Sequence, residues 1–224
     1  MKDEDVTYYI EMKNLEFAYA TGSFAIKGLS MGLEAGVFSA LTGANGSGKS
    51  TLAKLIAGVL HPASGSLYLD GRDAFRLSLG QRGKKLGYLM QNPAAQIFAP
   101  TVAEELSFIP RLLGHSPQSI QARREELLDF FGLGGREQES VFHLSWGEKQ
   151  RLALAGVLFT PPPYLLLDEP TWGLDPDKKA DLASLLHKLL EQGLGLTVIS
   201  HDRDFLDRFE GRRLVMEKGQ VYAE

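Results

Sequence analysis

Residues 43–51 read Gly-Ala-Asn-Gly-Ser-Gly-Lys-Ser-Thr, and this stretch decides the fold class. A glycine, four residues and then Gly-Lys-Ser have the spacing of a phosphate-binding P-loop. A polyphosphate needs many donors close together, and glycines let the backbone N–H groups approach it because no Cβ intervenes. Lys49 supplies a positive charge for the β- and γ-phosphates, and Ser50 offers a hydroxyl to Mg²⁺. The predicted nucleotide contacts of the loop are Gly43, Asn45, Gly46, Ser47, Gly48, Lys49, Ser50 and Thr51.

The segments on either side have the pattern that a P-loop requires. Residues 37–41 form a short apolar run, which predicts a strand. Leu52, Leu55 and Ile56 then have helical spacing, and Gly58 is expected to end that helix. The positive end of the helix points at the phosphates.

Strand and helix signals alternate along the rest of the chain. Apolar, branched and aromatic residues predict β-structure in several segments: 6–19, 29–41, 66–69, 86–90, 164–167 and 197–200. Asp175-Pro176 predicts the start of a helix that Gly193 ends. This alternation predicts an α/β core with a largely parallel sheet.

Residues 94–160 have a different, helical character. Thr101 with Glu104 and Ser145 with Glu148 have the spacing of capping boxes at helix starts. We therefore predict a helical insertion within the α/β core.

The composition suits one globular domain of 224 residues, of which 44% are hydrophobic. The net charge of −4 does not indicate a nucleic-acid partner, and we expect the arginine pairs at 123–124 and 212–213 to face solvent.

The absence of cysteine excludes disulfides and thiolate metal sites and fits a reducing cytoplasm. Residues 1–5 are acidic, without the apolar core of a signal peptide. No apolar run reaches the roughly 18 residues of a membrane span, so any spans would belong to another chain.

A second cluster of candidate residues follows a predicted buried strand. The run Leu165-Leu166-Leu167 leads directly into Asp168 and Glu169. Asp168 is placed to hold Mg²⁺, and Glu169 to orient or deprotonate a water molecule. His201 follows the strand at 197–200, at the edge where α/β proteins bind ligands. The alternatives are a surface acidic turn for the carboxylates and an ordinary loop residue for the histidine.

These motifs together resemble those of ATP-binding-cassette (ABC) ATPases over nearly the whole chain. Residues 144–151, Leu-Ser-Trp-Gly-Glu-Lys-Gln-Arg, are similar to the family signature, and residues 171–175 resemble its D-loop. Gln91 falls at the Q-loop, His201 at the switch histidine, and Tyr19 where the family stacks an aromatic ring on adenine.

The resemblance implies a P-loop NTPase (RecA-like) core with an antiparallel β subdomain and an inserted helical subdomain. Residues 1–93 and 161–224 would form the core, within one domain of residues 1–224, and residues 94–160 the helical part. It implies ATP and Mg²⁺ as ligands. Two cassettes would pair head to tail around two ATP molecules.

The resemblance also assigns roles to individual residues. The implied catalytic residues are Glu169, His201, Lys49 and Gln91. The implied metal ligands are Ser50, Gln91 and Asp168. The residues implied to act in trans, at the partner's nucleotide, are Ser145, Trp146, Gly147, Glu148 and Asp175.

One segment resembles a particular subgroup of the ABC ATPases. Residues 91–106, Gln-Asn-Pro-Ala-Ala-Gln-Ile-Phe-Ala-Pro-Thr-Val-Ala-Glu-Glu-Leu, are similar to energy-coupling-factor importer ATPases, which drive uptake of vitamins or of cobalt and nickel ions. This implies a peripheral subunit on the cytoplasmic face of the cell membrane. A transmembrane coupling subunit would dock near residues 91–108. An ordinary amphipathic helix that covers its own core is the alternative for that segment.

Two tryptophans depart from the family pattern. Trp146 stands where the signature usually has glycine, and Trp172 where the D-loop residue is usually small. They could contact each other, anchor the partner, or hold the signature away from the γ-phosphate. The alternative is that Trp146 points away from the phosphate and changes nothing. These departures favour a heterodimer with a second, different cassette over a homodimer. A soluble, non-transport ABC ATPase and a partly degenerate nucleotide-binding subunit of a heterodimeric pair remain as alternative functions.

Overall fold

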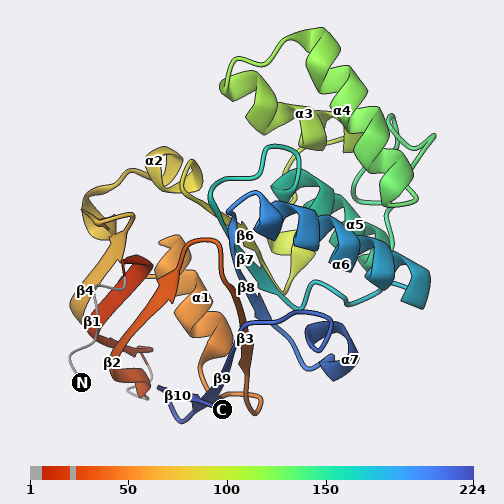
Figure 1. The fold of residues 1–224 in the computed structure, drawn as a ribbon. Helices are drawn as coiled ribbons and strands as arrows, with labels where there is room; N and C mark the ends of the chain where they lie inside the picture. The colour runs from red at the N-terminus through yellow and green to blue at the C-terminus, as the bar shows by residue number, and fades with distance from the viewer. Residues whose placement is uncertain (1–6, 21–23) are drawn as a thin grey trace. The chain divides into compact units, whose positions relative to one another are not determined.

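The computed structural model describes residues 7–20 and 24–224 (Figure 1). The acidic start at residues 1–5 lies outside the described residues. The chain divides into two compact units. The first comprises Met1–Tyr88, Pro162–Glu169 and Ala183–Glu224, and the second comprises Leu89–Pro161 and Pro170–Leu182.

A four-stranded antiparallel sheet belongs to the first unit, with the order β2-β1-β4-β5 (Figure 1). Its strands are β1 (Tyr8–Ala18), β2 (Phe24–Glu34), β4 (Ser64–Leu69) and β5 (Arg72–Asp73). The sequence predicts a single β-rich stretch at 29–41, whereas the structure has two strands there. Gly36 has a φ of 68°, in the left-handed region, and the chain turns between Glu34 and Phe38.

The second sheet has the order β10-β9-β3-β8-β7-β6 and brings the motifs to one edge. Its strands are β3 (Phe38–Thr42), β6 (Leu86–Leu89), β7 (Tyr164–Asp168), β8 (Gly195–Ile199), β9 (Arg212–Glu217) and β10 (Gln220–Ala223). β3 is parallel to β8 and β9, and β7 is parallel to β8, which confirms the predicted α/β core with a largely parallel sheet. The carboxyl ends of β3, β7 and β8 therefore meet at one edge.

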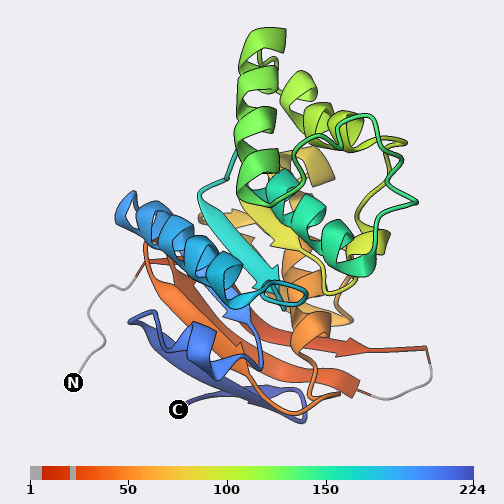
Figure 2. The same ribbon diagram turned by 90° about the vertical axis from the view of Figure 1, so that its right-hand side faces the viewer.

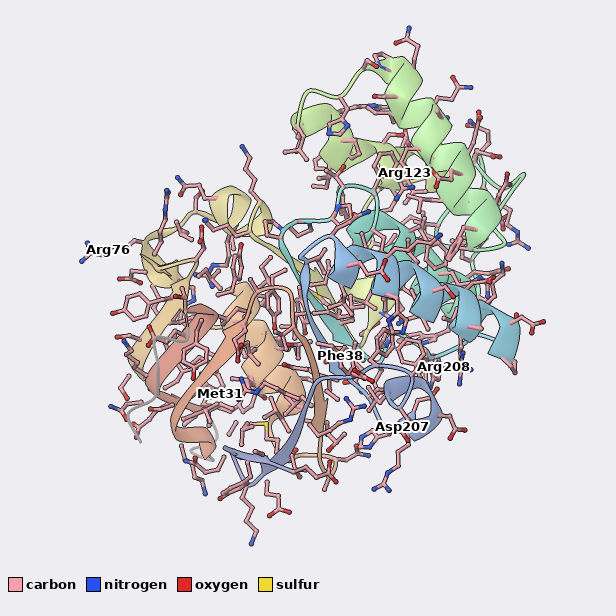
Figure 3. The ribbon with its side chains drawn as sticks, viewed as in Figure 1. Met31, Phe38, Arg76, Arg123, Asp207 and Arg208 are labelled. Atoms are coloured by element: carbon pink, nitrogen blue, oxygen red, sulfur yellow. The ribbon has the colours of Figure 1, made fainter. Side chains whose placement is uncertain are left out.

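Helices and a continuous core complete the first unit. α1 (Lys49–Ala57) ends at Gly58 as predicted, and two short helices, α2 (Leu79–Gly83) and α7 (Arg203–Leu206), follow later in the chain. A 3-10 turn covers Ala74–Arg76. The core joins residues of both sheets to α1, as Ile10, Leu41 and Leu55 illustrate. Phe38, labelled in Figure 3, stacks on Phe209 with ring centroids 4.6 Å apart.

The second unit is helical. Its helices α3 (Val102–Leu112), α4 (Pro117–Phe130) and α5 (Trp146–Val157) lie side by side (Figure 2), and a 3-10 turn covers Pro93–Ala95. α6 (Pro176–Glu191) begins here and continues into the first unit. Ser145 and Glu148 form the predicted capping box. At Thr101 only half of the predicted capping box is present. The Thr101 hydroxyl accepts the backbone N–H of Glu104, but the Glu104 carboxylate accepts a bond from that hydroxyl and not from the backbone N–H of Thr101.

The arginine pairs do not simply face solvent, so that prediction was wrong. Arg123 donates to the carbonyl of Leu158 at 3.1 Å, and Arg213 donates to the carbonyl of Phe209 at 2.7 Å. A guanidinium has five donors, and half-buried positions let these donors pair with carbonyls that cap α5 or follow α7. Within the described ranges, no helix combines the length and the apolar character that a membrane crossing requires.

Candidate active site

The P-loop connects β3 to α1, and its glycines have a steric explanation. Gly43 has a φ of 138°, and a Cβ there would lie 2.2 Å from the carbonyl oxygen of Met216. Gly46 has a φ of 79°, and a Cβ there would meet nothing within 4 Å. The first glycine is therefore required by the fold. The second is required by its backbone conformation, and it leaves open space beside the loop.

Lys49 lies inside the loop. Its ammonium donates to the carbonyls of Gly43 at 2.7 Å and Ala44 at 3.1 Å, and the residue is only 7% exposed. Burial lowers the pKa of Lys49, while the charges of Glu169 and Asp168 raise it. A bound polyphosphate would add further negative charge, and so would stabilise the protonated form of this lysine.

Asp168 ends β7 and is buried beside the P-loop helix. Burial raises the pKa of its carboxyl to about 6, against a hydrogen bond from Ser50 that lowers it. Its Oδ2 atom is buried and has no hydrogen-bond partner in the part of the chain that the structure describes. An unpaired buried carboxylate oxygen next to a hydroxyl fits a divalent cation. Among the described residues, no group of three or more His, Cys, Asp or Glu side chains is placed so that it could hold a metal ion by itself. Mg²⁺ commonly binds through one or two protein ligands and completes its shell with phosphates and water.

Glu169 and His201, predicted from separate strands, lie side by side. His201 Nε2 is 3.8 Å from Glu169 Oε1. Ser200 Oγ donates to the other carboxylate oxygen, Oε2, at 2.9 Å. The backbone of Glu169 is in the left-handed region, with a φ of 52°, and its N–H donates to the carbonyl of Ile199 at 2.8 Å. The end of β8 therefore holds both the backbone and the side chain of Glu169.

Tyr19 also lies in the first unit, near the P-loop helix. Its hydroxyl is 2.9 Å from Thr51 Oγ1, and its ring makes an edge contact with Phe17 at 4.9 Å between centroids. The side chain is 43% exposed, so part of the ring is open for stacking. Stacking on adenine stays a prediction.

The remaining candidates belong to the second unit. Ser145 donates through Oγ to Glu148 Oε2 at 2.8 Å, and Arg136 pairs with Glu148 Oε1 at 2.8 Å. The hydrogen bonds from Ser145 lower the pKa of Glu148, and the charge of Arg136 adds to this. Gln91 follows β6. Asp175 accepts a hydrogen bond from the Lys178 N–H at 2.8 Å, at the start of α6.

The two tryptophans contact each other. Trp146 begins α5, and its ring meets the edge of Trp172 with centroids 5.6 Å apart. The backbones beneath them are also close, because a Cβ on Gly173 would lie 2.9 Å from the Cα of Gly147. Trp146 is 41% exposed and Trp172 is 57% exposed.

Two residues of these sites, Ser200 and Arg136, are absent from the sequence-based predictions. Ser200 precedes the predicted histidine directly, and a hydroxyl at a strand end next to an acid–histidine pair was an available signal. Arg136 lies in a connecting segment and is joined to Glu148 only by the fold, so its sequence position carries no signal.

The fold and the first-unit site define a P-loop nucleotide-hydrolysing protein of α/β architecture. The sequence profile described as "ABC transporter" matches residues 26–172, and the chain belongs to that family. It is therefore an ATP-binding cassette with ATPase activity.

Two similar proteins can be aligned with almost the whole chain. The energy-coupling factor transporter ATP-binding protein EcfA of Methanothermobacter thermautotrophicus is 38% identical over 217 residues, covering 96% of this chain and 70% of that protein. The EcfA of Methanocaldococcus jannaschii is 36% identical, with 97% and 78% covered.

Solved structures of ABC cassettes have the same fold as this chain. CbiO1 of Clostridium perfringens, part of the ABC transporter complex cbiONQ, has a TM-score of 0.77 at 31% identity, covering 96% of this chain and 87% of that chain. A dimeric cassette in a post-hydrolysis state with ADP and Pi has a TM-score of 0.84 at 28% identity, with 96% and 97% covered.

Proposed function

We propose that this chain is the ATP-hydrolysing subunit of an energy-coupling-factor importer for a vitamin or a transition-metal ion. The observation that carries the proposal is its 38% identity to a protein named as an energy-coupling factor ATPase, over 96% of the chain. The segment at residues 91–106, which resembles the same group, supports it. The chain would act as a peripheral subunit on the cytoplasmic face of the membrane. Residues 94–160 would form the helical subdomain, and residues 1–93 and 161–224 the core.

The first-unit site supports an in-line hydrolysis of ATP. Glu169 would take a proton from a water molecule as that water attacks the γ-phosphorus and the bond to the β-phosphate oxygen breaks. Lys49 and the P-loop N–H groups would hold the phosphates, and His201 would contact the γ-phosphate. Tyr19 would stack on the adenine. Ser50, Asp168 and Gln91 would hold Mg²⁺, which when bound neutralises charge on the β- and γ-phosphates.

A second cassette would complete each nucleotide site. Structural neighbours are dimeric, and we propose a heterodimer in which this chain contributes residues to the partner's nucleotide. Those residues are Ser145, Trp146, Gly147, Glu148 and Asp175. The start of α5 would direct its N–H groups at the partner's γ-phosphate. The bond from Arg136 to Glu148 supports this role, because it fixes the capping box from which Ser145 projects.

Substitution of Trp146 and Trp172 tests whether these side chains anchor the partner cassette. We expect the double substitution Trp146→Gly and Trp172→Ala to weaken ATP-dependent pairing at least tenfold, since exposed aromatic pairs act as anchors worth roughly 2 kcal/mol or more. The measurement is sedimentation of this chain with its copurified partner cassette and ATP. Phe142→Ala, at a side chain that is 76% exposed in the same unit, is the control and should leave pairing unchanged. Equal pairing in the wild type, the double variant and the Phe142→Ala control would show that the tryptophans do not anchor the partner.

Exposed apolar residues lie before and along α3. Phe98 and Phe108 meet edge to face, with centroids 4.8 Å apart. Glu105 Oε2 accepts the N–H groups of Phe98 at 3.0 Å and Ala99 at 2.8 Å, which holds the segment before the helix in place. Phe98 is 58% exposed and Phe108 is 42% exposed. We propose that a coupling helix of the transmembrane subunit packs its apolar face here, within residues 91–108.

Phe98→Asp tests this docking surface. A charge at the centre of an apolar contact should lower recovery of the membrane subunit by about tenfold, while ATP binding stays unchanged. The measurement is quantitative copurification in detergent through a tag on this chain. Leu79→Asp introduces the same charge at a leucine that is 73% exposed in the first unit, and should have no effect on copurification. Normal recovery with Phe98→Asp would contradict the proposed surface.

A further inference from the structure

Ser200 follows β8 and is completely buried, with 0% of its surface exposed. Its Oγ accepts the backbone N–H of Asp202 at 3.1 Å and donates to Glu169 Oε2 at 2.9 Å. A hydroxyl has one proton to donate. Because the Asp202 N–H points at a lone pair of this oxygen, the hydroxyl proton is directed at the carboxylate.

Glu169 needs such a partner because its backbone is strained. A non-glycine residue with a φ of 52° persists only where the surroundings hold it. The bond from the Glu169 N–H to the Ile199 carbonyl holds the backbone, and the bond from Ser200 holds the side chain. The two oxygens of the carboxylate then differ. Oε2 is bonded to a buried hydroxyl, whereas Oε1 faces His201, whose side chain is 53% exposed.

We propose that Ser200 is a positioning residue for ATP hydrolysis, which fixes the Glu169 carboxylate so that Oε1 is presented to the attacking water. This inference rests on the base role proposed for Glu169. Ser200 itself does not contact the reacting atoms. It removes the freedom of the Glu169 side chain to rotate away, and a misplaced base loses rate without a loss of substrate binding.

Ser200→Ala tests the inference in the purified transporter assembly. We expect kcat to fall about tenfold, as for loss of one hydrogen bond to a charged group, with the KM for ATP changed by less than about twofold. Ser200→Thr keeps a hydroxyl and should restore most of the rate. Ser39→Ala is a matched control, because Ser39 lies in the neighbouring strand β3 and is also 0% exposed. Its hydroxyl has no partner among the described residues, so kcat should not change.

A double variant separates positioning from general damage. If Ser200 acts through Glu169, then Ser200→Ala should cost nothing further in a Glu169→Gln background. An additive loss, an equal loss in Ser39→Ala, or a change in KM without a change in kcat would overturn the inference. Wild-type turnover in Glu169→Gln would overturn the base role and the inference together. Low turnover in Glu169→Gln with wild-type turnover in Ser200→Ala would overturn the inference alone.

Discussion

Glu169→Gln should lower ATP turnover at least about a hundredfold while ATP binding is retained, because the amide cannot take a proton from water. The substitution preserves shape, and the Gln side-chain oxygen can still accept the bond from Ser200. The P-loop and Asp168, which would hold the phosphates and Mg²⁺, are unchanged. The measurement is steady-state phosphate release by the assembly together with equilibrium binding of ATP.

The same variant should trap the paired state of the cassettes. In sedimentation with saturating ATP and Mg²⁺, self-pairing would move the mass of the chain from 24.6 kDa to twice that value. A monomer that still binds ATP would point to a second cassette that is a different chain, as we propose, or to a membrane scaffold that pairing requires. Glu210→Gln, at an exposed residue of the first unit, is the control and should leave turnover unchanged. Turnover near the wild-type rate in Glu169→Gln would remove Glu169 from the role of base.

Local sequence patterns were enough to expect the P-loop, Asp168 and His201 near one another, for a topological reason. The P-loop, Asp168 and His201 each follow an apolar run that forms a strand, and parallel strands bring their carboxyl ends to one edge. Knowing that the three strands share a sheet was therefore enough to expect these residues near one another. The mutual contact of Trp146 and Trp172, which the sequence left as one of several possibilities, is present in the structure.

What the sequence did not predict depends on contacts between distant segments. The bond from Ser200 to Glu169 requires the relative register of β7 and β8, which no local pattern encodes. The charged sequence neighbours of the arginine pairs predict that these side chains face solvent. Arg212 instead donates to the carbonyl of Gly32, and that partner lies 180 residues away. The neighbours of an arginine in the sequence do not show whether its guanidinium group pairs with a carbonyl or with water.

Arg82 shows how much such a contact can contribute to the fold. It lies in the last turn of α2, is only 5% exposed, and donates to the carbonyls of Ile56 at 3.3 Å and of Ala74. Its guanidinium lies over the ring of Phe75 at 5.7 Å from the centroid. Burial lowers the pKa of this arginine, against the charge of Asp73. The side chain thus binds carbonyls at the C-terminal end of α1, where a cation is favoured by the helix dipole.

Arg82→Met should therefore destabilise the chain by about 3 kcal/mol, because methionine fills a similar volume but leaves these buried carbonyls without a donor. The measurement is the free energy of unfolding from urea titration. Arg76→Met is the matched control, since the Arg76 side chain is 87% exposed and forms a surface ion pair with Asp73. Arg76 is labelled in Figure 3. This control substitution should change stability by less than about 0.5 kcal/mol. Similar unfolding free energies in both variants would contradict this role of Arg82.

The response of these variants to nucleotide separates the two ends of α1. Ligand that binds only the folded state stabilises it by an amount set by its concentration and affinity. Arg82 contacts the last turn of α1, whereas Lys49 and Ser50 begin it. If the fold at the first turn is intact in Arg82→Met, saturating ATP should raise its unfolding free energy by the same increment as in the wild type. A smaller increment would mean that the buried guanidinium also helps to hold the P-loop, and that its contribution to stability and its contribution to binding are made through the same helix.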